Sequence, residues 1–147
     1  MVYKGHWNGS QMSGEGFLKF SNDLIINGEF QQNQLKDSKI QILYPNGDIY
    51  CGKHKGGIKN GDGNYKYKSS NIKYTGEWKD DKKQGKGEIV YPLGKGKGEI
   101  NARLSGIFEH DELHTGEYMD SLGNMFKSRK YDIKDMKRIQ EFISRNF

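Results

Sequence analysis

Residues 74–91, YTGEWKDDKKQGKGEIVY, decide the fold, because they carry the pattern of a β-hairpin. We predict one strand over residues 74–78 and a second over residues 85–91, with a charged turn between them. Alternate residues of a strand share a face, so the rings, aliphatic residues and glycines fall on one side and mostly polar residues on the other. Glycines at fixed strand positions indicate close approach of bulky groups. We expect them to open slots that rings from a neighbouring hairpin fill.

The same pattern recurs along the chain, which matters because a single hairpin cannot bury its apolar face alone. Copies open at Tyr3, Tyr50 and Tyr74. In each copy the first glycine of a Gly-x-Gly pair follows 11 residues after the opening tyrosine. The chain is therefore predicted to be an array of hairpins.

Two further copies are weaker. One opens at Ile26 and lacks the glycine pair; its return strand, Ile40, Ile42 and Tyr44, fits if the turn has gained one residue. Another opens at Leu104 and loses the pattern after Gly116. These degenerate units suggest locally specialised surfaces.

The units at 3, 50 and 74 resemble the MORN repeat, whose pattern runs Tyr-x-Gly-x-Trp, a short spacer and then Gly-x-Gly. His54 stands in place of the tryptophan, and the units at 26 and 104 match only in their first halves. The resemblance covers roughly residues 1 to 120. It implies an all-β fold, an elongated single-layer antiparallel β-meander of MORN hairpins. It also implies an interaction scaffold, often in the cytoskeleton, in cilia or at membranes.

The composition fits a thin array better than a compact globule. Hydrophobic residues make up 33% of the 147 residues, and the mean hydropathy is −0.96. In a repeat array each unit contacts only its neighbours, so a small core suffices. The pattern already begins at Tyr3, no apolar run has transmembrane length, and Cys51 is the single cysteine. These features favour an intracellular protein, with the cytoskeleton or a ciliary axoneme preferred and the cytoplasm otherwise.

Charge is unevenly distributed along the array. Residues 50–98 have a net charge of +7 and residues 99–120 a net charge of −5. Stacked hairpins would align the lysines of two turns along one edge: Lys53, Lys55, Lys59, Lys79, Lys82, Lys83 and Lys86. A solvated edge is the default interpretation. The alternative is an edge that binds anionic lipid headgroups or an acidic protein tail. Lysine gives point charges rather than bidentate base recognition, so we do not expect nucleic-acid binding.

We divide the chain into a repeat array at residues 1–126 and a basic C-terminal segment at residues 127–147. Asp132 is a candidate N-cap of an amphipathic α-helix. Its apolar positions recur every three or four residues: Ile133, Met136, Ile139, Phe142 and Ile143. The helix would cap the last hairpin or dock on a partner protein or membrane surface.

No constellation of catalytic residues stands out, and we predict a protein that is not an enzyme and uses no cofactor or metal. His110 and His114 have the spacing of metal ligands on a helix, yet they fall in a predicted hairpin turn. The run GKGKG at residues 94–98 could cradle a phosphate, but it lacks the P-loop spacing and reads as an inter-repeat loop.

The leading functional prediction is a non-enzymatic scaffold that binds other protein subunits of a large assembly; a homodimer is a further option. Contact with the partner is predicted at the exposed edges of the structural aromatics: Tyr3, Trp7, Phe30, Tyr50, Tyr74, Trp78 and Phe108. The alternative is a peripheral membrane module that binds anionic phospholipids through the lysine edge. A regulatory subunit of an enzyme cannot be distinguished from the scaffold by sequence.

Overall fold

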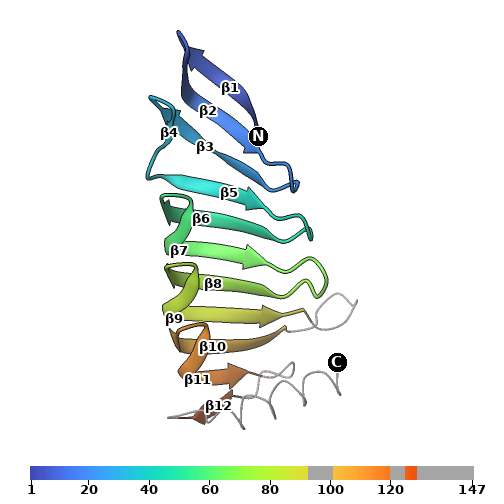
Figure 1. Cartoon of the computed structure of the whole chain (residues 1–147). Helices are drawn as coiled ribbons and strands as arrows, with labels where there is room; N and C mark the ends of the chain where they lie inside the picture. The colour runs from blue at the N-terminus through green and yellow to red at the C-terminus, as the bar shows by residue number, and fades with distance from the viewer. Residues whose placement is uncertain (93–100, 120–124, 129–147) are drawn as a thin grey trace.

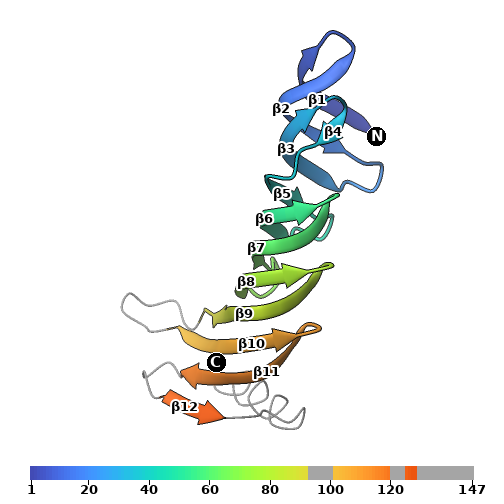
Figure 2. The same cartoon turned by 90° about the vertical axis from the view of Figure 1, so that its left-hand side faces the viewer.

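The described residues form an elongated, twisted antiparallel sheet of a single layer (Figures 1 and 2). The structure, a computed structural model, describes residues 1–92, 101–119 and 125–128. Within these residues the sheet has 12 strands, and their spatial order follows the chain, except that β4 pairs with β3 alone. The strands are β1 (Val2–Asn8), β2 (Gln11–Lys19), β3 (Ile25–Gln31), β4 (Gln34–Leu35), β5 (Lys39–Leu43), β6 (Ile49–Lys55), β7 (Ile58–Lys66), β8 (Lys73–Lys79), β9 (Lys82–Tyr91), β10 (Ala102–Glu109), β11 (Glu112–Met119) and β12 (Met125–Ser128).

This architecture confirms the predicted all-β meander. The helix predicted after Asp132, with its apolar residues, lies outside the described residues. The sheet continues through β12 to Ser128, two residues beyond the boundary predicted at 126. The weak unit at 104 forms a complete hairpin, β10–β11.

Two-residue turns close the hairpins. In the β8–β9 turn, Asp80 and Asp81 have φ angles of 49° and 67°. Two successive positive φ angles characterise the type I′ turn, whose twist matches that of the flanking strands. The prediction of a longer charged turn, with the return strand beginning at residue 85, was therefore wrong. The return strand begins at Lys82: Lys82 and Lys83 pair with Lys79 and Trp78, and a bulge follows them at residues 84–86.

The first glycine of each Gly-x-Gly pair lies at that bulge. Between Gly76 and Trp78 the pairing of β8 with β9 shifts, and Gly85 lies in the bulge with a φ of 81°. Gly14 and Gly61 occupy equivalent places, with φ angles of 75° and 96°. A residue with a side chain rarely adopts such angles. The first glycine thus serves the backbone conformation.

The second glycine makes room for a ring. A Cβ atom on Gly87 would lie 2.6 Å from Cε2 of Tyr74, so the ring covers the glycine directly. The Tyr74 hydroxyl then donates a hydrogen bond of 2.9 Å to the carbonyl oxygen of Glu77. Tyr3 covers Gly16 in the same way. The ring thus comes from the same hairpin, not from a neighbouring one as predicted, because the tyrosine leans two residues along its own strand.

A line of glycines crosses the sheet beneath these rings, in register from strand to strand. It comprises Gly5, Gly16 and Gly28, then, after Ile40, the residues Gly52, Gly63, Gly76, Gly87, Gly106 and Gly116. Rings of successive units meet above it edge to face. The centroids of Tyr3 and Phe30 are 5.0 Å apart, and those of Tyr74 and Phe108 are 5.1 Å apart. Such contacts link the rings of successive units. The main core cluster extends from Ile40 to Tyr118, and Phe30 packs against Tyr3 outside it.

The degenerate units fill the same space with leucine. Leu35 lies over Gly28, where a Cβ atom would be 2.7 Å from its Cδ1, and Leu113 lies over Gly116. The return strand of the unit at 26 is split into β4 and β5 by residues 36–38. The prediction that Ile40 and Ile42 lie on this return strand is confirmed; Tyr44 follows its end.

Candidate interaction surfaces

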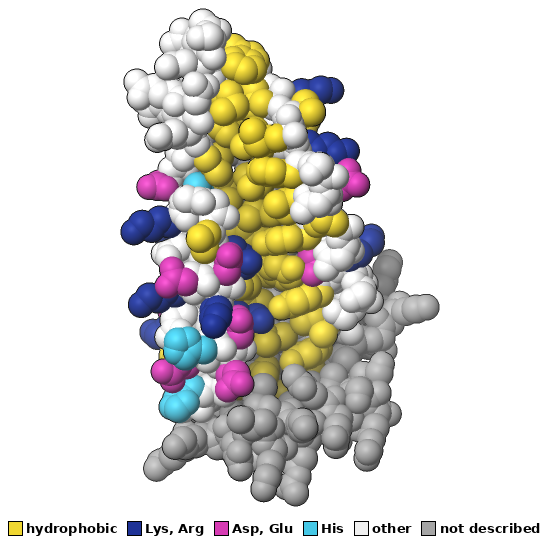
Figure 3. Space-filling view, in the orientation of Figure 1, with side chains coloured by type: hydrophobic (Ala, Val, Ile, Leu, Met, Phe, Trp, Pro, Cys, Tyr) yellow, Lys and Arg dark blue, Asp and Glu magenta, His cyan; other side chains and the backbone are white. Residues whose placement is uncertain are grey.

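The first surface is the aromatic stripe, formed by Tyr3, Trp7, Phe30, Tyr50, Tyr74, Trp78 and Phe108. Figure 3 shows hydrophobic side chains gathered along the long axis of the sheet. Within the array these rings are covered: Tyr50 and Tyr74 are 0% exposed, and Trp78 is 5% exposed. Trp7 is 56% exposed. Of the seven predicted contact residues, Trp7 alone presents most of its ring to a partner.

The exposure of Trp7 follows from its place in the array. Trp78 packs edge to face against Tyr74 of its own unit and Tyr50 of the preceding unit. Trp7 makes the first of these contacts, with Tyr3 at 5.1 Å. In the described residues Trp7 has no counterpart of the second contact, and 56% of its surface is exposed. The exposed part of the ring corresponds to the surface through which Trp78 contacts the preceding unit.

Lys59 lies on the aromatic face, contrary to its predicted place on the exposed edge. It is 8% exposed, and its Nζ is 5.2 Å from the centroid of the Trp78 ring. It donates a hydrogen bond of 3.2 Å to Tyr44 and forms an ion pair of 3.1 Å with Asp81. Burial lowers the pKa of Lys59, but the hydrogen bonds to Tyr44 and Asp81 outweigh it and raise the pKa above the usual value. The Lys59 ammonium group therefore stabilises the core through its contacts with aromatic rings.

Lys83 is placed in the same way. Its Nζ is 3.1 Å from the hydroxyl of Tyr67 and 5.5 Å from the centroid of Tyr74. A signal in the sequence could have found both lysines, because each lies nine positions after the opening residue of its unit, where the other three units have an apolar residue. The residues at this position are Met12, Leu35, Lys59, Lys83 and Leu113.

The second surface is the lysine edge, now reduced to Lys53, Lys55, Lys79, Lys82 and Lys86. All five side chains are exposed. Charged side chains gather along the edge of the hairpin turns, on the left of Figure 3. In the part of the chain that the structure describes, Lys53 is the one member with an ion pair, 3.9 Å from Asp62. The others remain available to an anionic partner.

The turns are tied to one another along this edge. The Asp81 carboxylate accepts a hydrogen bond of 2.9 Å from the backbone N–H of Lys59 in the preceding hairpin. Asp111 accepts one of 2.7 Å from Lys83. Asn33 accepts one of 2.7 Å from Met12.

The tie between the units at 26 and 50 is different. Gly57 occupies the turn position and has no side chain; its N–H donates to Nδ1 of His54 at 2.9 Å. Nε2 of His54 therefore carries the proton and donates to the carbonyl oxygen of Lys36 at 2.7 Å. His54 replaces the tryptophan because it joins this turn to the extra residues 36–38.

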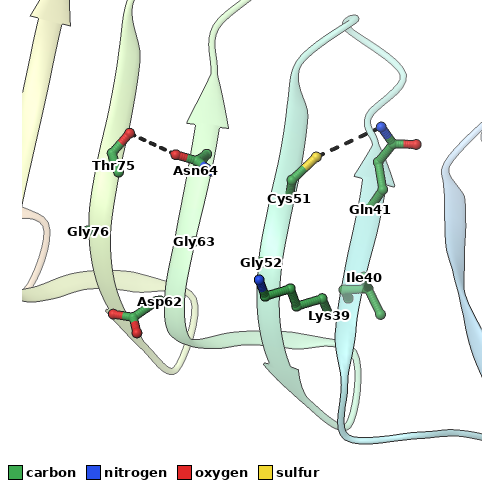
Figure 4. Close-up of a pocket in the computed structure, with 10 residues that line it drawn as sticks. All are labelled: Lys39, Ile40, Gln41, Cys51, Gly52, Asp62, Gly63, Asn64, Thr75 and Gly76. Atoms are coloured by element: carbon green, nitrogen blue, oxygen red, sulfur yellow. Dashed lines mark hydrogen bonds between the residues drawn. The ribbon is translucent and has the colours of Figure 1, made fainter.

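The third surface is the opposite, polar face of the sheet, where a shallow depression crosses β5 to β8 (Figure 4). It exposes Cys51, to which the Gln41 side chain donates a hydrogen bond of 3.8 Å. Asn64 and Thr75 form a bond of 2.8 Å across the next strand pair. No three His, Cys, Asp or Glu side chains of the described residues are placed to hold a metal ion. His110 and Asp111 form the turn between β10 and β11.

Comparison with known proteins identifies the repeats. A family model described as MORN repeat matches residues 3–24 and 74–97. Alsin from Rattus norvegicus and from Homo sapiens are each 30% identical over 98 residues, which cover 63% of this chain. The chain spans only 6% of the length of alsin. In the described residues no helix has the length and apolar character needed to cross a bilayer. The MORN repeat is a non-catalytic module, and the family model places two such repeats in this chain, at residues 3–24 and 74–97.

Proposed function

We propose that the chain is a non-enzymatic scaffold that binds another protein subunit of a larger assembly, with a cytoskeletal or axonemal assembly as its setting. MORN repeats are typically protein-binding or membrane-binding modules. The observation that carries the proposal is the 56% exposure of Trp7 at the end of an otherwise covered aromatic stripe. Exposed tryptophans of this kind are frequent energetic centres of protein interfaces.

The chemistry of the partner follows from what covers the other tryptophan. Trp78 lies between two tyrosine rings, whose centroids are 5.0 and 5.6 Å away. A partner that inserts an aromatic side chain beside Trp7 would complete the same arrangement. Tyr3 and Met12 are half-buried and would form the floor of this contact.

The test compares Trp7→Ala with Trp78→Ala. Because Trp7 is exposed, its replacement should cost less than about 1 kcal/mol of folding stability, whereas loss of the buried Trp78 should cost about 4 kcal/mol. Affinity purification from the source cells with quantitative mass spectrometry should show partners that are lost with Trp7→Ala although the variant is folded. Ile58→Ala is the control, since Ile58 is 46% exposed but lies away from the stripe. Unchanged partners with folded Trp7→Ala would refute this assignment.

The setting is tested separately. The tagged chain should remain in the detergent-insoluble cytoskeletal fraction of the source cells, and Trp7→Ala should move into the soluble fraction. Retention of both proteins, or of neither, would contradict attachment through this ring.

A second candidate function, binding to an anionic membrane surface, is supported by the lysine edge. Its five lysines are exposed, and lysines near a membrane surface contribute about 1 kcal/mol each at low salt. Co-sedimentation with vesicles that contain phosphatidylserine should be lost on adding salt and in the variant Lys79→Glu with Lys82→Glu. Vesicle binding that does not depend on lipid charge or on salt concentration would exclude this function.

A further inference from the structure

One row of the polar face combines apolar and basic side chains from successive strands. The register places Val2, Lys19, Ile25, Leu43, Ile49, Lys66 and Lys73 directly opposite one another, strand by strand. We call this set the polar-face row. It runs perpendicular to the strands, along the long axis of the sheet.

The apolar members of this row do not contribute to the core. Each is the chain neighbour of a residue on the aromatic face: Ile25 precedes Ile26, Leu43 follows Ile42, and Ile49 precedes Tyr50. The core cluster and the residues packed on it include Ile26, Ile42 and Tyr50 and omit the three row members. Ile25, Leu43 and Ile49 are half-buried, and Val2 is 54% exposed. Ile25, Leu43 and Ile49 are contiguous in the row, and Lys19 separates them from Val2. Apolar surface that the core does not use is a candidate interaction site.

The row continues into two lysines that face each other. Lys66 pairs directly with Lys73 across β7 and β8, and both side chains are exposed. Like charges directly opposite destabilise a sheet. Neither forms an ion pair with a carboxylate among the described residues. An anionic group beside them would relieve this repulsion.

We propose that the polar-face row is the docking site of an acidic amphipathic helix from a partner protein. Adjacent strands lie about 4.8 Å apart, and a helix advances about 5.4 Å per turn. A helix laid along the row therefore places one apolar side chain per turn near Ile25, Leu43 and Ile49. Carboxylates on the next two turns meet Lys66 and Lys73.

The surroundings of the row favour a helix over a lipid surface. The adjacent row is polar and satisfied within the sheet: Asn27 donates to Gln41 at 2.8 Å, and Thr75 donates to Asn64 (Figure 4). Burying these groups beneath lipid would remove their remaining contacts with water. A helix covers only a narrow strip and keeps its polar side over them. An acidic partner is favoured over the tail of this chain, because residues 121–147 carry a net charge of +4.

This site is separate from the proposed contact at Trp7. Trp7 lies on the aromatic face, and the polar-face row lies on the other side of the same single layer. The scaffold could then hold two partners at once, one on each face. The two proposals can fail independently.

The single cysteine offers a reporter for occupancy of the row. Cys51 is exposed and two residues from Ile49 on the same face of β6. An environment-sensitive fluorophore on Cys51 would be titrated with a synthetic helical peptide of about 18 residues, long enough to cover five turns. This peptide has leucine every third or fourth position, glutamate beside them and a helix-stabilising staple. We expect saturable binding of this peptide, at least about tenfold tighter than a matched peptide with lysine in place of glutamate.

Variants assign the binding to the row. Leu43→Thr with Ile49→Thr, which places β-branched side chains suited to strands at both positions, should weaken binding about tenfold. Lys66→Glu with Lys73→Glu should weaken binding of the acidic peptide about tenfold and strengthen binding of the lysine peptide. The matched control is Lys39→Glu with Lys53→Glu, the same charge change at another facing pair on this face, with an expected loss below about threefold. Trp7→Ala should leave peptide binding unchanged. Circular dichroism and urea unfolding establish that each variant is folded.

Three results would overturn the proposal. The first is equal binding of the acidic and basic peptides, or unchanged binding in folded row variants. The second is a fluorophore response to phosphatidylserine vesicles without any response to the acidic peptide, which would assign the row to a membrane. The third is concentration-dependent self-association in sedimentation that the row variants abolish, which would assign it to a second copy of the chain.

Discussion

The units at 74 and 104 solve one packing problem in two ways. In the first, the Tyr74 ring lies over Gly87, and Lys83 extends above the ring. In the second, Leu104 replaces the tyrosine, and Leu113 lies over Gly116. The space above the glycine line must be filled once, either from the opening position or from the position nine residues later. The two positions are therefore coupled, and a tyrosine unit differs from a leucine unit as a set of residues.

The bulge in β9 is also one of the features that distinguish a tyrosine unit from a leucine unit. The Tyr74 hydroxyl reaches the carbonyl oxygen of Glu77, in the segment where β9 bulges at Gly85. In the leucine unit no phenol needs this carbonyl, the pairing shifts by a smaller step, and His114 stands where the first glycine would be. The first glycine is thus linked to the tyrosine through the bulge.

The largest expected effect is alkaline unfolding driven by the tyrosine units. Burial raises the pKa of Tyr50 and Tyr74 well above the usual value near 10, and it raises the pKa of Tyr91 to about 12. Folding therefore favours the protonated phenols, and this stabilisation is full below pH 10 and is lost as the pH rises toward the folded pKa values. We expect cooperative unfolding between about pH 10 and 12. Tyrosinate absorbance and circular dichroism should change together; phenols that titrate near pH 10 with the sheet intact would contradict this.

A methyl group on the glycine line should distinguish the two kinds of unit. In Gly87→Ala the new Cβ meets a ring held by its hydrogen bond to Glu77, and we expect a loss of about 3 kcal/mol in unfolding free energy. In Gly28→Ala it meets the flexible end of Leu35, and we expect about 1 kcal/mol. Urea unfolding measures both. Equal losses in unfolding free energy would mean that the Tyr74 ring and the Leu35 side chain give way to the new methyl group equally well.

Conversion of one kind of unit into the other tests the coupling directly. Tyr74→Leu alone leaves Gly87 uncovered and should cost about 3 kcal/mol. Adding Lys83→Leu supplies the leucine that covers the glycine in the unit at 104, and it should restore about 1 kcal/mol. A double-mutant cycle by urea unfolding provides the interaction energy. Strict additivity of the two changes would refute the coupling.

The smallest expected effect on stability comes from removing the tyrosine hydroxyl alone. Tyr74→Phe keeps the ring over Gly87 and removes the hydrogen bond of 2.9 Å to Glu77, at an expected cost of about 1 kcal/mol. Tyr3→Phe removes the same bond where it is exposed, and water can replace it, so we expect about half as much. Thermal unfolding of the two variants gives the comparison. A larger loss at Tyr3 would contradict the role assigned to burial.

The alternation and spacing of the sequence predicted the hairpins, the shared face of Tyr74, Gly76 and Trp78, and the return strand through Ile40 and Ile42. They could not separate two uses of glycine. Gly85 supplies a positive φ angle and Gly87 supplies space, yet both appear as one Gly-x-Gly pair. Lys82, Lys83 and Gln84 also resembled a turn, which made the predicted return strand too short.

The interaction surfaces were only partly predictable. Lysines are exposed in most proteins, so Lys59 and Lys83 were assigned to the edge, although rings surround both. The polar-face row depends on register across connections of different length, such as residues 20–24, 44–48 and 67–72. Hydrophobic alternation gives the face of each strand but does not align side chains across such loops.

The ties between turns have a direction. Asn33, Asp81 and Asp111 each reach back to the hairpin made earlier in the chain. A hairpin that leaves the ribosome would therefore find its docking groups already in place on the unit before it. The array could therefore fold one hairpin at a time during synthesis. A chain halted after any turn would retain the hydrogen bonds between all earlier turns.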